Sequence, residues 1–206
     1  MRKPIIAIDG PASSGKGTIA RLLADRLGFA YLDTGLLYRA LAYLGESQQP
    51  SVQDVLRVMK ETPEETLRSE EIGNKASVIA GTQSVREMLL QLQRDFAANP
   101  GEKYNGSVLD GRDIATIVVP NADHKIFITA GLEIRVLRRL EFLRQNDPRI
   151  TYEEVYENLA ARDEQDRSRK IAPLVFNESY DALVDTSYDS IEESFGKVIR
   201  VITARF

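Results

Sequence analysis

Short apolar runs alternate along the chain with longer stretches in which apolar residues recur every three or four positions. The run Pro4–Asp9 is apolar and rich in β-branched residues, and it predicts a buried strand. From Lys16 to Leu27 the apolar residues fall on one helical face, and Gly28 follows as a stop signal. The chain therefore opens with a strand, a glycine-rich loop and a helix.

The same alternation continues to the end of the chain. Further strands are predicted at Tyr31–Leu32, Ser107–Asp110, Lys125–Thr129 and Ala182–Asp185. Helices are predicted at Gly35–Leu44, 84–96, 132–146, 151–168 and 190–205. Such alternation favours an α/β fold in which helices cover both faces of a parallel sheet. The polar segment 45–72, with one short helix near Val52–Lys60, is the candidate inserted lobe of this single domain.

Composition excludes several classes of protein. The net charge is −4, so no global positive field attracts the chain to nucleic acid. Zero cysteines exclude disulfides and thiolate metal sites. The first apolar run, Ile5–Ile8, is too short for a signal peptide, and no run approaches the roughly 20 residues of a membrane span. A soluble, cytoplasmic protein without membrane or nucleic-acid partners is expected.

The stretch IDGPASSGKGT indicates a phosphate-binding loop, because it follows a strand and opens a helix. Gly10 and Gly15 allow backbone conformations that turn successive N–H groups toward phosphate oxygens. The helix N-terminus adds its positive dipole end, and Lys16 adds a full charge near the β- and γ-phosphates. The stretch predicts a nucleoside-triphosphate site formed by Gly10, Pro11, Ala12, Ser13, Ser14, Gly15, Lys16, Gly17 and Thr18.

Gly17 stands where the general loop pattern has serine or threonine. The usual hydroxyl contacts Mg²⁺, and glycine has none to offer. Phosphates, water and a carboxylate from elsewhere must then hold the ion. Asp110, which ends a predicted strand, is the candidate for this metal site, acting through water. The alternative is that Asp110 only forms a turn before Gly111.

The form GxxxxGKGT resembles the loop of nucleoside monophosphate kinases. Together with LDTGLLYR, NKAS, VRE, LDGRDIAT and RDEQDRSR, in that order, it resembles bacterial cytidylate kinases. The resemblance implies a three-layer P-loop kinase with a five-stranded parallel sheet, a monophosphate-binding lobe at about 40–99 and a lid at about 138–169. It further implies phosphoryl transfer from ATP to CMP or dCMP. We expect the enzyme to use Mg²⁺ with ATP and to act as a monomer.

The resemblance also assigns acceptor-site residues. Arg39 and Arg112 match arginines that bind the acceptor phosphate, a task suited to a planar guanidinium. Asp113, Ser77 and Arg86 match the groups that read cytosine, because a carboxylate accepts from its amino group and the other two donate to its N3 and O2. From the residues alone, Asp113 could cap a helix, Ser77 could be an ordinary helix hydroxyl, and Arg86 could pair with Glu87 or Asp95. The LDTGLLYR motif adds Asp33 and Tyr38 to the substrate site.

Two groups of helical arginines complete the predicted site. Arg162, Asp166 and Arg169 share a helix face and could be a surface ion-pair ladder, but the resemblance places Arg162 and Asp166 at the ribose and Arg169 at the acceptor phosphate. Three further arginines crowd one helix and resemble those of the family's lid, which close over ATP: Arg135, Arg138 and Arg139. The expected catalytic set is Lys16, Arg112, Arg138 and Arg169. His124 is expected in a turn and outside catalysis.

The chain departs from the family pattern in two places. Only residues 40–73 separate the YR and NKAS motifs, so the lobe is expected to be reduced. Ala115 stands where the family often has glycine, which predicts a tighter loop. Competing hypotheses are an adenylate-type kinase, a shikimate-type kinase and a GTP-dependent switch. Adenylate kinases typically have an aromatic residue and a proline where this chain has Arg112 and Asp113, and shikimate would not require Ser77, Arg86 and Asp113. The switch is disfavoured because NKAS lacks the aspartate that closes a guanine-reading N-K-x-D motif.

Overall fold

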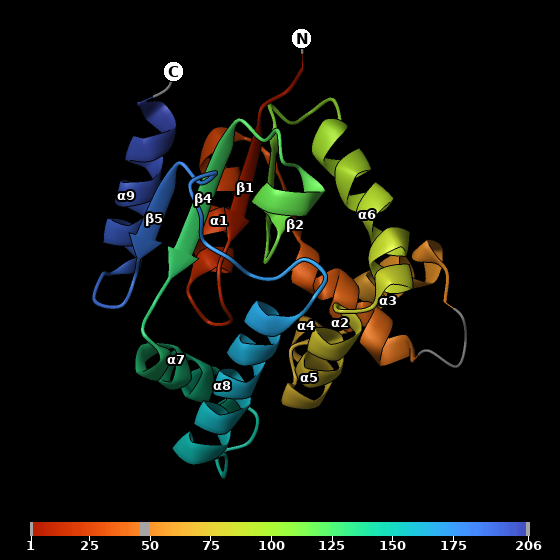
Figure 1. Ribbon diagram of the computed structural model, residues 1–206, viewed down its shortest axis with the longest axis vertical. Helices are drawn as coiled ribbons and strands as arrows, with labels where there is room; N and C mark the ends of the chain where they lie inside the picture. Colours follow the sequence, from red (N-terminus) through yellow and green to blue (C-terminus); the bar gives the residue numbers. More distant parts are fainter. Residues whose placement is uncertain (1, 46–49, 205–206) are drawn as a thin grey trace.

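Five parallel strands form one sheet in the computed structural model, which describes residues 2–45 and 50–204 (Figure 1). The strands lie in the order β2-β3-β1-β4-β5. Their bounds are β1 Ile5–Asp9, β2 Ala30–Asp33, β3 Ser107–Gly111, β4 His124–Thr129 and β5 Ala182–Asp185. The predicted five-stranded parallel sheet is confirmed. Central β1 is bonded to β3 and to β4, and ligands of open α/β sheets bind beyond the carboxyl ends of such strands.

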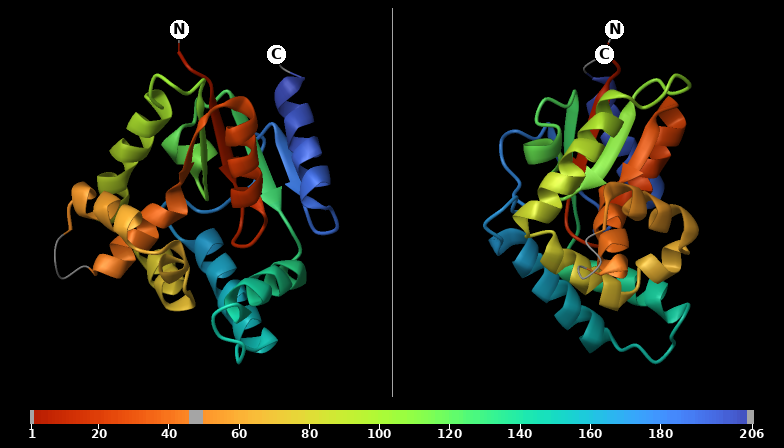
Figure 2. Two further views of the ribbon diagram at one scale, coloured as in Figure 1. Left: turned by 180° about the vertical axis from the view of Figure 1, so that it is seen from behind. Right: turned by 90° about the vertical axis from the view of Figure 1, so that its right-hand side faces the viewer.

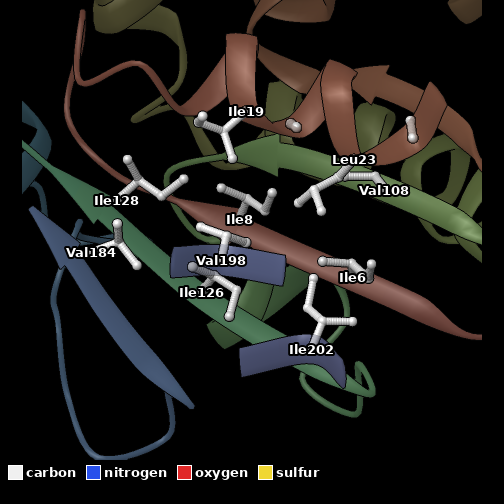
Figure 3. Close-up of a cluster of buried hydrophobic side chains, with 12 residues drawn as sticks. Ile6, Ile8, Ile19, Leu23, Val108, Ile126, Ile128, Val184, Val198 and Ile202 are labelled. Atoms are coloured by element: carbon white, nitrogen blue, oxygen red, sulfur yellow. The ribbon is translucent and has the colours of Figure 1, made fainter. Parts of the chain in front are cut away.

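Helices cover both faces of this sheet, as predicted. The helices α1 (Lys16–Leu27) and α9 (Ile191–Thr203) lie together on one face, seen from behind in Figure 2. Figure 3 shows Ile6 and Ile8 of β1 between side chains of these two helices. Alternate residues Ile5 and Ala7 point to the other face. They pack there with α6 (Gln83–Ala98) and the short π-helix η2 (Ile114–Val118).

The lobe that follows β2 consists of helices and short connections, with no strand among its described residues. Beside α6 it contains α2 Thr34–Leu44, α3 Val52–Glu61, α4 Glu64–Leu67 and α5 Glu70–Ile79. These helices share a core of their own that includes Leu37, Val55, Leu67 and Leu89. The lobe therefore has its own hydrophobic core and is more than a polar insertion.

The lid region is a hairpin of two helices, α7 (Leu132–Arg144) and α8 (Tyr152–Ser168). Val136 and Leu140 of α7 pack on Val155 and Leu159 of α8, and Ala12 of the glycine-rich loop joins this cluster. The lid and the lobe both lie at the carboxyl end of the sheet (Figure 1). The sequence-predicted ATP and acceptor residues are thereby brought to one end of the molecule.

Several predicted elements need correction. The segment 45–72 was predicted to hold one short helix, but it also contains α4 and the start of α5. Their signal is weak because α4 has 4 residues and buries only Leu67. Helix α5 begins at a polar cap, Ser69, whose hydroxyl accepts from the Ile72 N–H. The π-helix η2 was not predicted. Residues 46–49, in the predicted insert, and residue 205, in the predicted last helix, lie outside the described residues.

His124 is also corrected. It was expected in a turn, but it is the first residue of β4, where it pairs with Ile6 of β1 and is buried. Strand pairing therefore continues one residue further toward the N-terminus than the apolar pattern indicated. Along the described stretches, no helix has the length and apolar character to cross a membrane.

Candidate active site

A cavity of about 870 Å³ opens between the sheet, the lobe and the lid. Its walls carry Ala12 to Thr18 of the glycine-rich loop, and all of the acceptor-site residues predicted from the sequence. Those acceptor residues are Asp33, Tyr38, Arg39, Ser77, Arg86, Arg112, Asp113, Arg162, Asp166 and Arg169. Side chains up to about 150 residues apart in the chain thus face one space.

The glycine-rich loop has the geometry of an anion site. Ser13 and Gly15 both have positive φ, 59° and 85°, so the backbone curls around the N-terminus of α1. Gly10 is required for packing, because a Cβ there would lie 1.9 Å from the Ile128 carbonyl oxygen of β4. Gly10 and Pro11 form the base of the loop and do not line the cavity, whereas the residues from Ala12 onward do.

Lys16 lies at the centre of the cavity's charged groups. Burial, and next the positive charge of Arg112, lower the pKa of the Lys16 ammonium to about 8, and the nearby Asp110 opposes this shift. An anion beside Lys16 would therefore be strongly favoured. The fully buried Ser14 hydroxyl oxygen has no hydrogen-bond partner among the described residues. The Lys16 ammonium donates a long 3.4 Å hydrogen bond to the Pro11 carbonyl oxygen. The loop thus keeps a weakly bonded cation and an unpartnered hydroxyl oxygen inside the fold, as an anion site does.

Asp110 lies beside this loop at the end of β3, buried against Gly17 and Tyr31. The Tyr31 hydroxyl donates a 2.9 Å hydrogen bond to Asp110 Oδ1, and a Cβ on Gly17 would lie 3.7 Å from Oδ2. Burial, and next the charge of Asp33, raise the pKa of the Asp110 carboxyl to about 7, and Lys16 opposes the rise. The interpretation of Asp110 as a turn residue does not fit, because its carboxylate makes no turn hydrogen bond and faces the loop.

This donor set suits Mg²⁺, which prefers oxygen ligands and keeps several waters. Among residues 2–45 and 50–204, no group of three or more His, Cys, Asp or Glu side chains could hold a metal by itself. A cation near Lys16 would have to share phosphate oxygens and water with Asp110. The structure therefore fits the predicted metal site, in which Asp110 acts through water, without a cage of protein ligands.

Arginines crowd the wall opposite the loop. Arg39 of α2 is buried and donates to the carbonyl oxygens of Leu67 at 2.7 Å and Ser69 at 3.2 Å. Burial, and then the positive charge of Arg162 and other arginines, lower the pKa of Arg39 to about 9. A Cβ on Gly73 of α5 would lie 2.8 Å from Arg39 and 3.3 Å from Arg162, so a larger residue there would displace these guanidiniums. This crowding of cations favours an anionic ligand.

Asp166 of α8 is the centre of the next group. It accepts a 2.8 Å bond from Arg112 Nε, lies 3.6 Å from Arg169, and is reached by the Ser77 hydroxyl at 3.5 Å. Ser77 bonds more closely to Gln165, at 2.8 Å. Asp166 is only 4% exposed, so the interpretation as a surface ion-pair ladder is wrong. The helix brings its polar face inward, onto the cavity.

The base-reading candidates meet as a buried ion pair. Arg86 of α6 binds Asp113, which follows β3, and Arg86 also donates to the Ala80 carbonyl. The Tyr38 ring lies 5.9 Å from the Arg86 guanidinium. The predicted alternatives for two of these residues are wrong: Arg86 pairs with neither Glu87 nor Asp95, and the Asp113 side chain caps no helix.

The three predicted lid arginines have different surroundings. Arg138 reaches the Thr186 hydroxyl at 2.9 Å and lines the cavity next to the loop. Arg139 also lines the cavity and bonds to Glu70 of α5, which ties lid to lobe. Arg135 does not line the cavity: it is buried in a two-bond pair with Asp163, 2.6 and 3.0 Å, and contacts the Ala12 carbonyl. Its contact with ATP stays a prediction.

Sequence reasoning missed two cavity residues that the fold supplies. Arg68, between α4 and α5, lines the cavity and pairs with Asp33 at 2.5 Å. Tyr31 of β2 also lines the cavity and binds Asp110. Arg68 stands in a segment interpreted as a polar loop, so its signal was weak. For Tyr31, the parallel pairing of β2 with β3, which places it near Asp110, could not be inferred from the local pattern.

Comparisons with known proteins agree with this arrangement. A family model described as cytidylate kinase matches residues 6–204. A cytidylate kinase of Azorhizobium caulinodans is 45% identical, covering 96% of this chain and 97% of its own length. A cytidylate kinase of Thermotoga maritima is 40% identical, covering 97% of each chain.

A solved structure of an uncharacterized protein from Eubacterium ventriosum has the same fold. It has a TM-score of 0.59 at 12% sequence identity, and it covers 98% of this chain and 99% of its own length. Sequence, family model and fold agree over nearly the whole chain, and the chain belongs to the cytidylate kinase family.

Proposed function

We propose that this chain transfers the γ-phosphoryl group of ATP to CMP or dCMP, with ATP on the glycine-rich loop and the monophosphate between lobe and lid. The observation that carries this proposal is the single cavity that runs from Lys16 to the buried Arg86–Asp113 pair. One end offers backbone N–H groups and a lysine to a triphosphate, and the other offers a polar pair to a base. The arginines between them suit phosphates brought together for transfer.

On the donor side, the proposed ATP contacts are the loop residues and the lid. Lys16 neutralises charge on the β- and γ-phosphates, and Arg138 approaches from the lid beside Gly15, where a Cβ would lie 3.8 Å from its guanidinium. Asp110 would hold Mg²⁺ through water, and the ion, when bound, would neutralise further phosphate charge. Gly17 leaves open the space between the loop and Asp110.

On the acceptor side, Arg39, Arg112 and Arg169 are proposed to hold the monophosphate, and Arg162 and Asp166 the sugar hydroxyls. Arg112 donates its Nε–H to Asp166 and an Nη1–H to the Gly111 carbonyl oxygen, so its remaining terminal N–H groups are the ones that can turn to the phosphate. The phosphate acceptor is already ionised, so no general base is needed. The chain's contribution to rate is position and charge stabilisation.

Cytosine selection is proposed to rest on Arg86 and Asp113, helped by Ser77. A carboxylate accepts from the exocyclic amino group of cytosine, and a guanidinium donates to N3 or O2. Uracil presents a carbonyl to Asp113 in its place, and a buried polar mismatch of this kind discriminates by orders of magnitude. The Arg86–Asp113 pair is already formed in the fold, so the base would meet a preset surface.

We also propose that the chain acts as a monomer in the cytoplasm and binds no nucleic acid. One chain carries both halves of the cavity, so no second copy is required to complete it. The net charge of −4 gives no broad attraction for a nucleic-acid backbone. Sedimentation of the purified chain, alone and with CMP, tests the monomer proposal.

The experiment that tests the activity is ADP release from ATP and Mg²⁺ with CMP, dCMP, UMP, AMP or shikimate offered singly. We expect turnover with CMP and dCMP to exceed turnover with the others by about a hundredfold or more. Comparable turnover with UMP or AMP would overturn Ser77, Arg86 and Asp113 as selectors. Turnover with shikimate alone would overturn the assignment of the acceptor site.

A further inference from the structure

Gly17 stands where the general loop pattern has a serine or threonine hydroxyl, and two side chains from the sheet border this position. A Cβ on Gly17 would lie 3.6 Å from the Tyr31 hydroxyl oxygen and 3.7 Å from Asp110 Oδ2. These are ordinary contact distances, and Gly17 has no positive φ. Glycine is therefore not required by strain or clash at this position. The side chain is absent at the point where Tyr31 and Asp110 meet.

Tyr31 holds Asp110 in one orientation. Its hydroxyl donates to Oδ1 at 2.9 Å, and among the described contacts Oδ2 is left facing Gly17. Tyr31 lies on β2 opposite Val108, two residues before Asp110 on β3, so its long side chain reaches diagonally along the sheet. The ring is fixed from the other side by the Arg21 guanidinium, 5.2 Å from its centroid.

We propose that Tyr31 is a positioning residue that takes over the part normally played by the loop hydroxyl, by aiming Asp110 at the cation that accompanies ATP. This rests on the proposed metal role of Asp110. In a usual loop a serine or threonine after the lysine contacts the ion directly. Here Gly17 has no hydroxyl, and the Tyr31–Asp110 pair on the neighbouring strands β2 and β3 provides the oxygen that faces the ion.

The test measures the linkage between cation and nucleotide, without turnover. The affinity for a non-hydrolysable ATP analogue is measured by calorimetry with Mg²⁺ and with a chelator, and the ratio of the two dissociation constants is compared among variants. We call this ratio, the increase in nucleotide affinity that Mg²⁺ produces, the gain from Mg²⁺. For Tyr31→Phe we expect the gain to fall about tenfold, at the lower end of the loss in metal affinity when an outer-shell partner is removed. Affinity in chelator should stay unchanged. Tyr43→Phe, which removes an exposed hydroxyl from α2, is the matched control.

Rescue separates this role from a merely structural one. Gly17→Ser in the Tyr31→Phe background restores a hydroxyl at the usual place, and we expect it to recover most of the lost gain. An unchanged gain in Tyr31→Phe, or a loss that the second substitution does not recover, would overturn the proposal for Tyr31. Asp110→Asn tests the underlying assignment: an undiminished gain there would overturn the metal role of Asp110, whatever the tyrosine does. Thermal melting of each variant checks that it is folded.

Discussion

The two ends of the cavity are built in different ways. The donor end is made by a continuous stretch of backbone, from Ala12 to Thr18, curled by positive φ angles around one helix N-terminus. The acceptor end is made by side chains from α2, α5, α6, α8 and the segment after β3, joined in ion pairs. A backbone site tolerates changes of side chain except at its lysine. In a site of paired charges, removing one partner also leaves the other charge buried without its counter-ion.

The largest expected effect is at the donor end. Lys16→Met should lower kcat by about a thousandfold, because it removes the one ammonium of the loop from the position of the transferred group. Steady-state ADP release measures this, with Lys60→Met on the surface of α3 as the control. Because the loop backbone remains, ATP binding should weaken far less than turnover. A parallel loss of binding and turnover would show that Lys16 serves ground-state binding only.

At the acceptor end, Arg112→Ala should raise the KM for CMP by about a hundredfold while ATP affinity persists. The substitution removes the proposed phosphate contact and the 2.8 Å partner of the buried Asp166, which keeps the 3.6 Å contact to Arg169 and the nearby charge of Arg162. Arg112→Lys should recover little, since an ammonium cannot reproduce the guanidinium fork. Kinetics in CMP at saturating ATP measure the effect. Normal CMP turnover by Arg112→Ala would remove this residue from the acceptor site.

Asp9, at the end of β1, anchors the segment that follows β3, and its titration contributes to stability. Its buried carboxylate accepts from the N–H groups of Ile114 and Ala115 and from the Tyr180 hydroxyl. Burial raises the pKa of Asp9 to about 6, from 3.8. Between these values the folded chain keeps a proton that the unfolded chain has lost. This contribution to stability is therefore complete below about pH 4 and lost as pH rises through 6, about 3 kcal/mol in all.

Denaturant unfolding of the wild type and of Asp9→Asn across pH 4 to 7 measures this contribution. The asparagine variant cannot titrate, so the difference in unfolding free energy between the two proteins should change with pH in that window. Asp110 has a pKa raised in the same direction but is present in both proteins, so it cancels in the difference. A difference that is constant with pH would mean that Asp9 ionises normally in the fold.

The same contrast explains what the sequence predicted well and what it did not. The glycine-rich loop, the individual strands and the flanking helices follow from local patterns, since the residues that make each of them are neighbours in the chain. The motif resemblance assigned both Arg86 and Asp113 to base recognition, but their ion pair depends on how α6 packs beside β3. Arg68 and Tyr31 were missed because their role depends on a partner from another element, Asp33 and Asp110 respectively. The helices α4 and α5 were missed because they bury few apolar residues, which leaves a weak local pattern.

The smallest expected effect is at Gly73, and it isolates packing from charge at the acceptor end. Gly73→Ala adds one methyl group 2.8 Å from Arg39 and 3.3 Å from Arg162, so both guanidiniums must shift while every charge is kept. We expect the KM for CMP to rise about tenfold, as misplacement of positioning groups does, with ATP affinity unchanged. Gly196→Ala on α9, where a Cβ meets only the end of Arg200 at 3.9 Å, is the matched control. If Gly73→Ala left CMP kinetics unaltered, the acceptor end would tolerate displacement as readily as the loop does, and the contrast between the two ends would fail.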